Sequence, residues 1–309
     1  MASVEIGKGI LLKADPIANT FRDEIKTAIS ACPRPPKLVG ILATTSSPSK
    51  SYADFTKKQC DALGVEFVLK KTGAAEDPAL DEGEGVEDAI IEANEDESVD
   101  GIMVYYPIFG VQQDHYLQQI VSPFKDVEGL HFKFHYNLYH NIRYLDPKTL
   151  HTSAIPSKPP VPAVEDQPPP GTVKSVLPCT PSPLSNVWNI SATVTIINRS
   201  EVVGRPLAAL LANDGARVFS VDIDSIQEYT KRPRQSAARQ FHPRHVVHPT
   251  SMTLQDCLAI SDVVVSAVPN VREKASLYMP TIGKVTIMML LRNLLRLQEY
   301  RKYRSAETS

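Results

Sequence analysis

The sequence predicts an α/β fold of two domains, with a parallel sheet in the first and a further βαβ unit in the second. The chain has 309 residues, of which 42% are hydrophobic and 22% are charged, so it has enough apolar material for two cores. In both halves, short apolar runs alternate with segments of helical periodicity, a pattern typical of βαβ units. Between the halves, residues 146–170 are rich in proline and lack periodicity, which predicts an extended linker.

The first half predicts a βαβαβ arrangement. Its elements are, in order, a strand at 37–44, a helix at 52–63, a strand at 65–70, a helix at 86–94 and a strand at 101–107. Because helices connect successive strands, the strands should be parallel. The acidic stretch 74–88 fits a solvated connection. The segment 131–141 has three histidines at irregular spacing, which matches no metal-ligand pattern and suggests an aromatic-rich packing loop.

The second half predicts another βαβ unit followed by a third strand. Its elements are a β-branched strand at 192–200, a helix at 202–214, a strand at 217–224, a short helix at 254–260, a strand at 262–269 and an apolar helix at 285–304. We therefore expect an N-terminal domain over 1–150, joined by the last helix (288–309). A linker or insertion at 151–172 and a C-terminal domain over 173–287 complete the expected organisation.

Composition excludes several classes of function. The formal net charge of -2 and the pI near 6.5 give no basic field of the kind that attracts nucleic acid or anionic membranes. The start of the chain lacks the pattern of a signal peptide, and no segment is apolar for long enough to span a bilayer. Four cysteines without a CxxC pair fit thiols in a reducing compartment. We expect a cytoplasmic protein.

A candidate phosphate-binding turn follows the strand at 192–200. The string NRSEVVGRP (198–206) leads into a helix, and backbone N–H groups at a helix N-terminus favour a phosphate. Asp222 ends the next strand, where an acidic side chain can bind both ribose hydroxyls of an adenosine. A carboxylate there would repel a 2′-phosphate, so a bound dinucleotide would be NAD rather than NADP. From pattern alone, an ordinary turn and a solvated strand end explain these residues equally well.

Two further strings carry candidate site residues. KDVEGL (125–130) contains Asp126 and Glu128 beside a glycine turn. Carboxylates there can accept paired N–H donors from a flat heterocycle, although such a string is more often a surface turn. In LPCTP (177–181), Cys179 lies between two prolines with no histidine nearby in sequence. A packed thiol is therefore a better interpretation than a nucleophile.

Together these strings resemble the methylenetetrahydrofolate dehydrogenases, most closely their fungal monofunctional NAD-dependent type. The similarity covers most of the chain, from about Gly9 to Lys302, and the order of the strings is preserved. The strings that carry it are YADFTKKQCDALG, GIMVYYPIFG, DHYLQQIV, KDVEGL, LPCTP, INRSEVVGRPLAALLANDGA, VFSVDID and KASLYMPTIGKVTIMMLLRN.

The resemblance implies an enzyme of one-carbon metabolism and purine synthesis. It would oxidise 5,10-methylenetetrahydrofolate to the 5,10-methenyl form with NAD and without a metal, and it would form a homodimer. Folate would lie between an N-terminal catalytic domain and a C-terminal Rossmann-like domain. The last helix would return to the N-terminal domain. The implied catalytic residues are Tyr52, Thr56 and Cys179. The implied substrate-binding residues are Tyr52, Tyr105, Asp126 or Glu128, and Gly283 and Thr286 in a loop that closes on the substrate. The implied cofactor-binding residues are Arg199, Ser200, Gly204, Arg205, Asp222, Ile223, Ala267, Val268 and Pro269.

Two departures from related sequences refine this expectation. The bifunctional relatives carry a lysine and a glutamine where this chain has Thr56 and Tyr105, and hydrolysis of the methenyl product needs an ionisable group near water. We therefore expect no cyclohydrolase activity. The chain also lacks a segment with a strand after Asn270 and most of a helix after Pro183. The alternative is thus an inactive family member that binds folate or dinucleotide, or the product of a truncated gene model.

Overall fold

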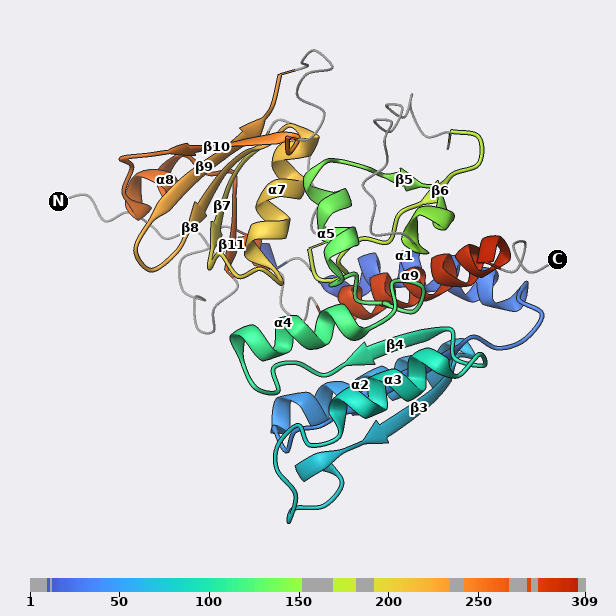
Figure 1. The fold of residues 1–309 in the computed structure, drawn as a ribbon. Helices are drawn as coiled ribbons and strands as arrows, with labels where there is room; N and C mark the ends of the chain where they lie inside the picture. The colour runs from blue at the N-terminus through green and yellow to red at the C-terminus, as the bar shows by residue number, and fades with distance from the viewer. Residues whose placement is uncertain are drawn as a thin grey trace. The chain divides into compact units, whose positions relative to one another are not determined.

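The computed structural model describes residues 10–11, 13–151, 169–181, 192–233, 242–266, 277–278 and 283–304. These residues form two compact units, each of which combines a sheet with helices (Figure 1). Unit 1 consists of residues 1–18, 136–142 and 180–286, and unit 2 of residues 19–135, 143–179 and 287–309. The predicted α/β class is confirmed, and most of the last helix belongs to unit 2, as expected.

Unit 2 has a three-stranded parallel sheet at its centre, in the order β3-β2-β4. Its strands are β2 (Lys37–Leu42), β3 (Glu66–Lys71) and β4 (Gly101–Val104). Its helices are the main part of α1 (Ala14–Ser30), α2 (Ser47–Leu63), α3 (Val86–Glu95), α4 (Val111–Ile120), the start of α5 (Phe132–Tyr139) and most of α9 (Gly283–Arg304). Short elements complete it: the 3-10 helices η1 (Gly73–Ala75) and η2 (Pro147–His151), and a pair of strands, β5 (Tyr144–Leu145) and β6 (Val173–Lys174). The predicted βαβαβ order is confirmed.

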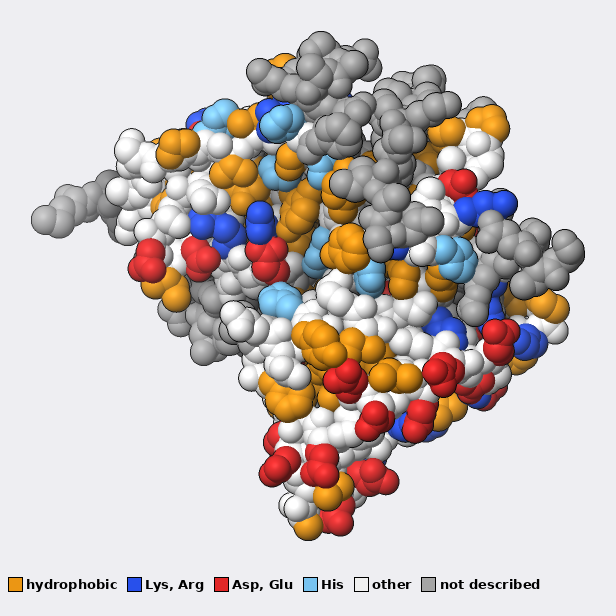
Figure 2. Space-filling view, in the orientation of Figure 1, with side chains coloured by type: hydrophobic (Ala, Val, Ile, Leu, Met, Phe, Trp, Pro, Cys, Tyr) orange, Lys and Arg blue, Asp and Glu red, His pale blue; other side chains and the backbone are white. Residues whose placement is uncertain are grey.

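The core of unit 2 explains why its central strands are apolar throughout. All but the first residue of β2 are buried, as expected of a parallel strand covered on both faces. Apolar side chains of α3 and α4 pack with those of β2 and β4 in one cluster. In the connection between β3 and α3, most residues are exposed, and acidic side chains gather over that end of unit 2 (Figure 2).

Unit 1 contains a mixed five-stranded sheet in the order β10-β9-β8-β7-β11. Its strands are β7 (Thr193–Ile197), β8 (Arg217–Val221), β9 (Ile226–Lys231), β10 (His245–Pro249) and β11 (Val263–Ser266). Its helices are α7 (Gly204–Asp214) and α8 (Leu254–Ile260), and the short strands β1 (Ile10–Leu11) and β12 (Leu277–Tyr278) pair with each other. β7 is parallel to β8 and to β11, whereas β8, β9 and β10 are antiparallel.

Two features differ from the sequence-based expectation. Residues 132–139 form helix α5 instead of a packing loop, because Phe134 and Leu138 lie one turn apart and both are buried. The strands β9 and β10 were not anticipated, and they extend the sheet beside β8. Among the described residues, no helix is long and apolar enough to cross a membrane.

Candidate active site

The first group of candidate residues surrounds Tyr52 on α2. The Tyr52 ring meets the Tyr105 ring edge-on, with 6.1 Å between centroids. Burial raises the pKa of the Tyr52 phenol, and the negative charges of Cys179, Glu128 and Tyr105 raise it further. A mutual electrostatic effect of this kind requires proximity. Unit 2 therefore brings together four residues that the sequence analysis selected from four separate strings.

Thr56 occupies the position one helical turn after Tyr52. Its side chain is fully buried, and its hydroxyl donates a hydrogen bond of 2.8 Å to the Tyr52 carbonyl oxygen. Threonine often makes this bond to the preceding turn of a helix. Thr56 is thus an internal packing residue with no ionisable group and no surface that a ligand could reach.

The turn that carries the two candidate acids is held from inside the unit. Asp126 is 3% exposed, and its carboxylate accepts backbone N–H bonds from Glu128 (3.1 Å), Gly129 (2.9 Å) and His131 (2.8 Å). The buried ammonium of Lys125 donates to three carbonyl oxygens at the end of α3, those of Ala93, Asn94 and Asp96. Both side chains therefore serve to fix the backbone of the turn.

Glu128 is the candidate acid whose carboxyl makes fewer hydrogen bonds within the protein. One of its oxygens accepts the Val104 N–H at 3.1 Å, at the end of β4, and the residue is only partly buried. Burial raises the pKa of Glu128 to about 8, and the negative charge of Asp126 adds to the shift against the effect of the Val104 bond. Burial also raises the pKa of Asp126 to about 6, although the backbone N–H groups that point at its carboxyl oppose the shift.

These pKa directions predict how stability depends on pH. A carboxyl whose pKa is raised by folding holds its proton in the folded state after the unfolded chain has lost it. The free energy of unfolding should therefore fall as pH rises from about 4.5 towards 8. Urea denaturation at a series of pH values measures this slope. The substitution Glu128→Gln should make it shallower, and an unchanged slope would show that Glu128 is not the titrating group.

Cys179 is held directly against the same turn. Its thiol is buried, and its backbone N–H donates to the Glu128 carbonyl oxygen at 3.0 Å. Gly129 makes this approach possible: a Cβ built at this position would lie 2.8 Å from the Leu177 carbonyl carbon, and the glycine has a φ of +71°. The KDVEGL and LPCTP strings are therefore neighbours in space.

This close approach predicts a large effect of Gly129→Ala. The new methyl group would meet backbone that cannot move away easily, in addition to the strain of a positive φ. We expect a loss of at least about 2 kcal/mol in the free energy of unfolding, measured by urea denaturation. Gly171→Ala is the matched control, because Gly171 has a φ of +77° but nothing within 4 Å of its Cβ position. If Gly129→Ala and Gly171→Ala lose the same free energy of unfolding, steric crowding at Gly129 does not determine the loss.

The second group of candidates lies in unit 1, at the turn between β7 and α7. Asn198 has a φ of +85°, and a Cβ on Gly204 would lie only 1.8 Å from the Asn198 carbonyl oxygen. Ser200 closes the turn, since its hydroxyl accepts the N–H groups of Val203 and Gly204 at 3.2 and 3.4 Å. The glycine is therefore required by the fold of the turn itself.

Arg199 leaves this turn and is fixed at the far end of β8. Its guanidinium makes four hydrogen bonds, two to Ser220 and two to Ser225. Arg205, in the first turn of α7, pairs with Glu201 at 2.5 Å, and its guanidinium lies 5.4 Å from the centre of the Tyr139 ring. The Arg199 guanidinium is thus fixed at the end of β8, and the Arg205 guanidinium lies at the start of α7.

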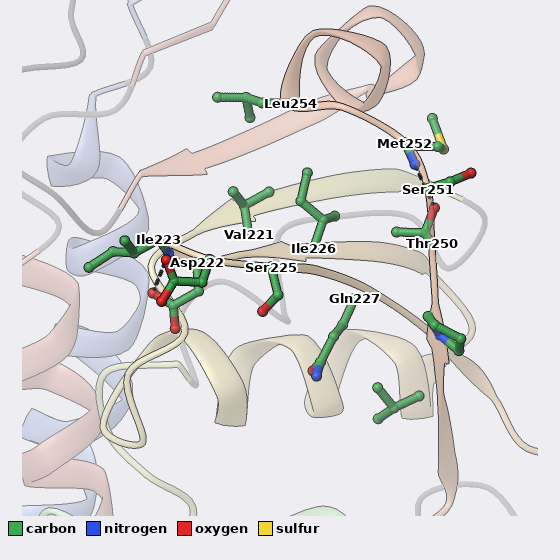
Figure 3. A pocket seen from close by; sticks show the side chains of 13 residues that line it. Val221, Asp222, Ile223, Ser225, Ile226, Gln227, Thr250, Ser251, Met252 and Leu254 are labelled. Atoms are coloured by element: carbon green, nitrogen blue, oxygen red, sulfur yellow. Dashed lines mark hydrogen bonds between the residues drawn. The ribbon is translucent and has the colours of Figure 1, made fainter.

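A hollow of about 910 Å³ lies beside Asp222 (Figure 3). Asp222 and Ile223 form part of the tight turn from β8 to β9, and Ile223 is 96% exposed. The lining residues are Val221 to Gln227, Val247, Pro249 to Met252, and Leu254. The hollow combines apolar walls with an exposed carboxylate and has the volume of a small-molecule site. Arg199 does not line the hollow, but it bonds Ser225, which does.

The remaining predicted residues are placed differently or not at all. Gly283 and Thr286 lie in the first turn of α9, which begins two residues before the predicted helix start at 285. They are therefore helical, whereas the resemblance implied that they belong to a loop over 279–286. Residues 267–269 (Ala, Val and Pro) lie outside the described residues. The sequence analysis missed the β10 side of the hollow, for which the alternating strings IQEYTK and HVVHP were the available signal.

Comparisons with known proteins agree with this arrangement. Residues 12–128 match the family model for the catalytic domain of tetrahydrofolate dehydrogenase/cyclohydrolase. The NAD(+)-dependent methylenetetrahydrofolate dehydrogenase of Schizosaccharomyces pombe is 40% identical over 331 aligned positions, which cover 93% of this chain and 92% of the relative. The corresponding enzyme of Saccharomyces cerevisiae is 36% identical over 337 positions, covering 94% and 96%.

A solved structure extends the similarity to three dimensions. The NAD-dependent 5,10-methylenetetrahydrofolate dehydrogenase of Saccharomyces cerevisiae superimposes with a TM-score of 0.76 at 36% identity, covering 94% of this chain and 97% of that one. Because 331 aligned positions exceed the 309 residues of this chain, the Schizosaccharomyces pombe relative contains residues that are absent here. With this identity over nearly the full length of both proteins, the chain belongs to the methylenetetrahydrofolate dehydrogenase family.

Proposed function

We propose that this protein oxidises 5,10-methylenetetrahydrofolate to 5,10-methenyltetrahydrofolate with NAD as the hydride acceptor. The observation that carries the proposal is the convergence of Tyr52, Glu128 and Cys179 in unit 2. A half-buried carboxyl beside an aromatic ring suits a flat heterocycle with adjacent N–H donors. The fungal relatives carry the printed name of this NAD-dependent activity.

Glu128 is the acid that we propose for the pterin edge. Both oxygens of Asp126 already accept backbone N–H groups of their own turn, whereas Glu128 accepts one. Paired N–H donors of a bound pterin would favour the ionised carboxylate. Tyr52 would lie against the pterin and p-aminobenzoyl rings, with the Tyr105 ring supporting it from the side.

We propose that unit 1 binds NAD. When bound, NAD would accept the hydride. Asp222 would accept hydrogen bonds from the ribose hydroxyls and repel a 2′-phosphate. The turn of Arg199, Ser200 and Gly204 would receive the pyrophosphate at the start of α7, near Arg205. On the basis of the sequence resemblance, we also propose Ile223 and residues 267–269 as cofactor contacts, Gly283 and Thr286 as substrate contacts, and Cys179 as a catalytic residue.

We propose that the enzyme lacks cyclohydrolase activity. Attack of water on the methenyl product needs an ionisable group that can assist proton transfer. At the position of the lysine of bifunctional relatives, this chain has the buried Thr56. Lys57 and Lys58, the next residues of α2, are both exposed, and they are rotated by about 100° and 200° from Thr56 around the helix.

We further propose a homodimer in the cytoplasm, with a folate-binding catalytic domain and a Rossmann-like NAD-binding domain. The sequence resemblance supports the dimer. The compartment is supported by the four cysteines, none of which forms a disulfide.

An absorbance assay of the purified chain tests the proposed function. Methylenetetrahydrofolate is supplied with NAD or with NADP, and formation and decay of the methenyl product are followed. We expect product with NAD only, decaying no faster than in buffer. A folded protein that binds folate without turnover would instead support the inactive family member, which the residues missing relative to the Schizosaccharomyces pombe enzyme favour.

A further inference from the structure

We infer that Asn293, on α9, is a positioning residue that holds Glu128 and Cys179 in register for folate binding. The side chain is 2% exposed. Its amide nitrogen has two hydrogens, and it donates one bond to the Val127 carbonyl oxygen at 2.9 Å and another to the Leu177 carbonyl oxygen at 2.8 Å. A single planar group thereby joins the KDVEGL and LPCTP strings.

The two acceptors place Asn293 directly behind the proposed folate site. Val127 immediately precedes Glu128, and Leu177 lies two residues before Cys179. The only other described backbone bond between these strings is the one from the Cys179 N–H to the Glu128 carbonyl oxygen. Because the strings are in contact at Gly129 without side-chain bulk, the amide supplies most of the directional bonding that fixes their separation.

Asn293 is one member of a polar stripe along α9. Arg296 donates to the Ser175 carbonyl oxygen at 3.1 Å, and the Tyr300 hydroxyl bonds the Lys174 carbonyl oxygen and the Val176 N–H. The spacing of positions 293, 296 and 300 places them on one helix face. The side chains of this helix face satisfy backbone groups of residues 174–177, as a neighbouring strand would do. Among the three side chains, Asn293 is the one nearest to Cys179.

The stripe also provides a matched control. Tyr300→Phe removes buried hydrogen bonds of the same helix to the same segment, but at the end remote from Cys179. Loss of stability alone should therefore affect Tyr300→Phe and Asn293→Ala alike. Displacement of Glu128 and Cys179 should occur only in Asn293→Ala, with Asn293→Ser as a milder variant if the alanine protein does not fold.

The kinetic test rests on the proposed function. In Asn293→Ala we expect the folate KM to rise at least tenfold while the NAD KM changes less than twofold. Tyr300→Phe should leave both KM values within twofold of wild type at a similar loss of thermal stability. In a Glu128→Gln background, Asn293→Ala should change the folate KM less than twofold, because the contact that it positions is already altered.

A second test does not depend on enzymatic activity. Labelling of Cys179 by iodoacetamide, followed by peptide mass spectrometry, should be at least fivefold faster in Asn293→Ala and unchanged in Tyr300→Phe. Cys60, buried in α2, is the internal control. If wild type shows no turnover, the proposed function fails and this labelling alone decides the inference. Equal folate KM and equal labelling in the two variants would overturn it.

Discussion

Replacing Glu128 by glutamine should lower kcat/KM for methylenetetrahydrofolate about 100-fold, which corresponds to about 2.7 kcal/mol. A carboxylate that accepts paired N–H donors forms charge-assisted bonds of about 1.5–3 kcal/mol each. Glutamine keeps the volume and one acceptor oxygen, but it presents an NH₂ group to a ligand donor. The effect should appear in steady-state kinetics with NAD held at saturation.

Two controls isolate this effect. Glu66→Gln, on the exposed edge of β3, removes a carboxylate from unit 2 without touching the site and should leave kcat/KM unchanged. The NAD KM of Glu128→Gln should stay within twofold of wild type. Full activity in Glu128→Gln would remove the carboxyl from the proposed mechanism and direct attention to Tyr52 and Cys179.

Replacing Asp222 by serine should shift the preference for NAD over NADP by at least about 100-fold. If Asp222 contacts the ribose as proposed, the substitution removes acceptors for two hydroxyls and weakens NAD binding. It also removes the repulsion of a 2′-phosphate, which strengthens NADP binding. Both changes act on the ratio in the same direction. The ratio of kcat/KM values for the two coenzymes measures the shift.

Asp224→Ser provides the comparison within the same turn. Asp224 is exposed and lines the same hollow, so its removal changes the local charge equally. We expect it to shift the coenzyme preference less than fivefold. If both variants shift the ratio equally, the discrimination comes from the general negative field of the turn and not from a specific contact of Asp222.

The periodicity of apolar residues predicted the central strands and helices of both units, because burial in a core requires apolar side chains at regular positions. The apolar runs at 37–44 and 192–200 became β2 and β7, with nearly every side chain of β2 buried. Segments with mixed composition were harder. In α5, the buried pair Phe134 and Leu138 is separated by histidine, tyrosine and asparagine, so the helical spacing was hidden by polar and aromatic neighbours.

The candidate acids show a different limit of sequence reasoning. Asp126 and Glu128 flank Val127 and both carry a carboxyl, so the chemistry of the string does not separate their roles. The difference arises from the backbone: the turn directs three of its own N–H groups at Asp126 and none at Glu128, which accepts one N–H from Val104 of β4. Likewise, the contribution of Asn293 depends on a helix more than 100 residues away in sequence.

The most direct test of the proposed reaction is transfer of deuterium from the substrate to the coenzyme. Methylenetetrahydrofolate carrying two deuterium atoms on the methylene carbon is incubated with the purified chain and NAD, and the reduced coenzyme is analysed by mass spectrometry. We predict NADH one mass unit heavier than that formed from unlabelled substrate, because the hydride passes directly between the two carbons. Absence of reduced coenzyme, or NADH without deuterium, would contradict the proposed dehydrogenase function.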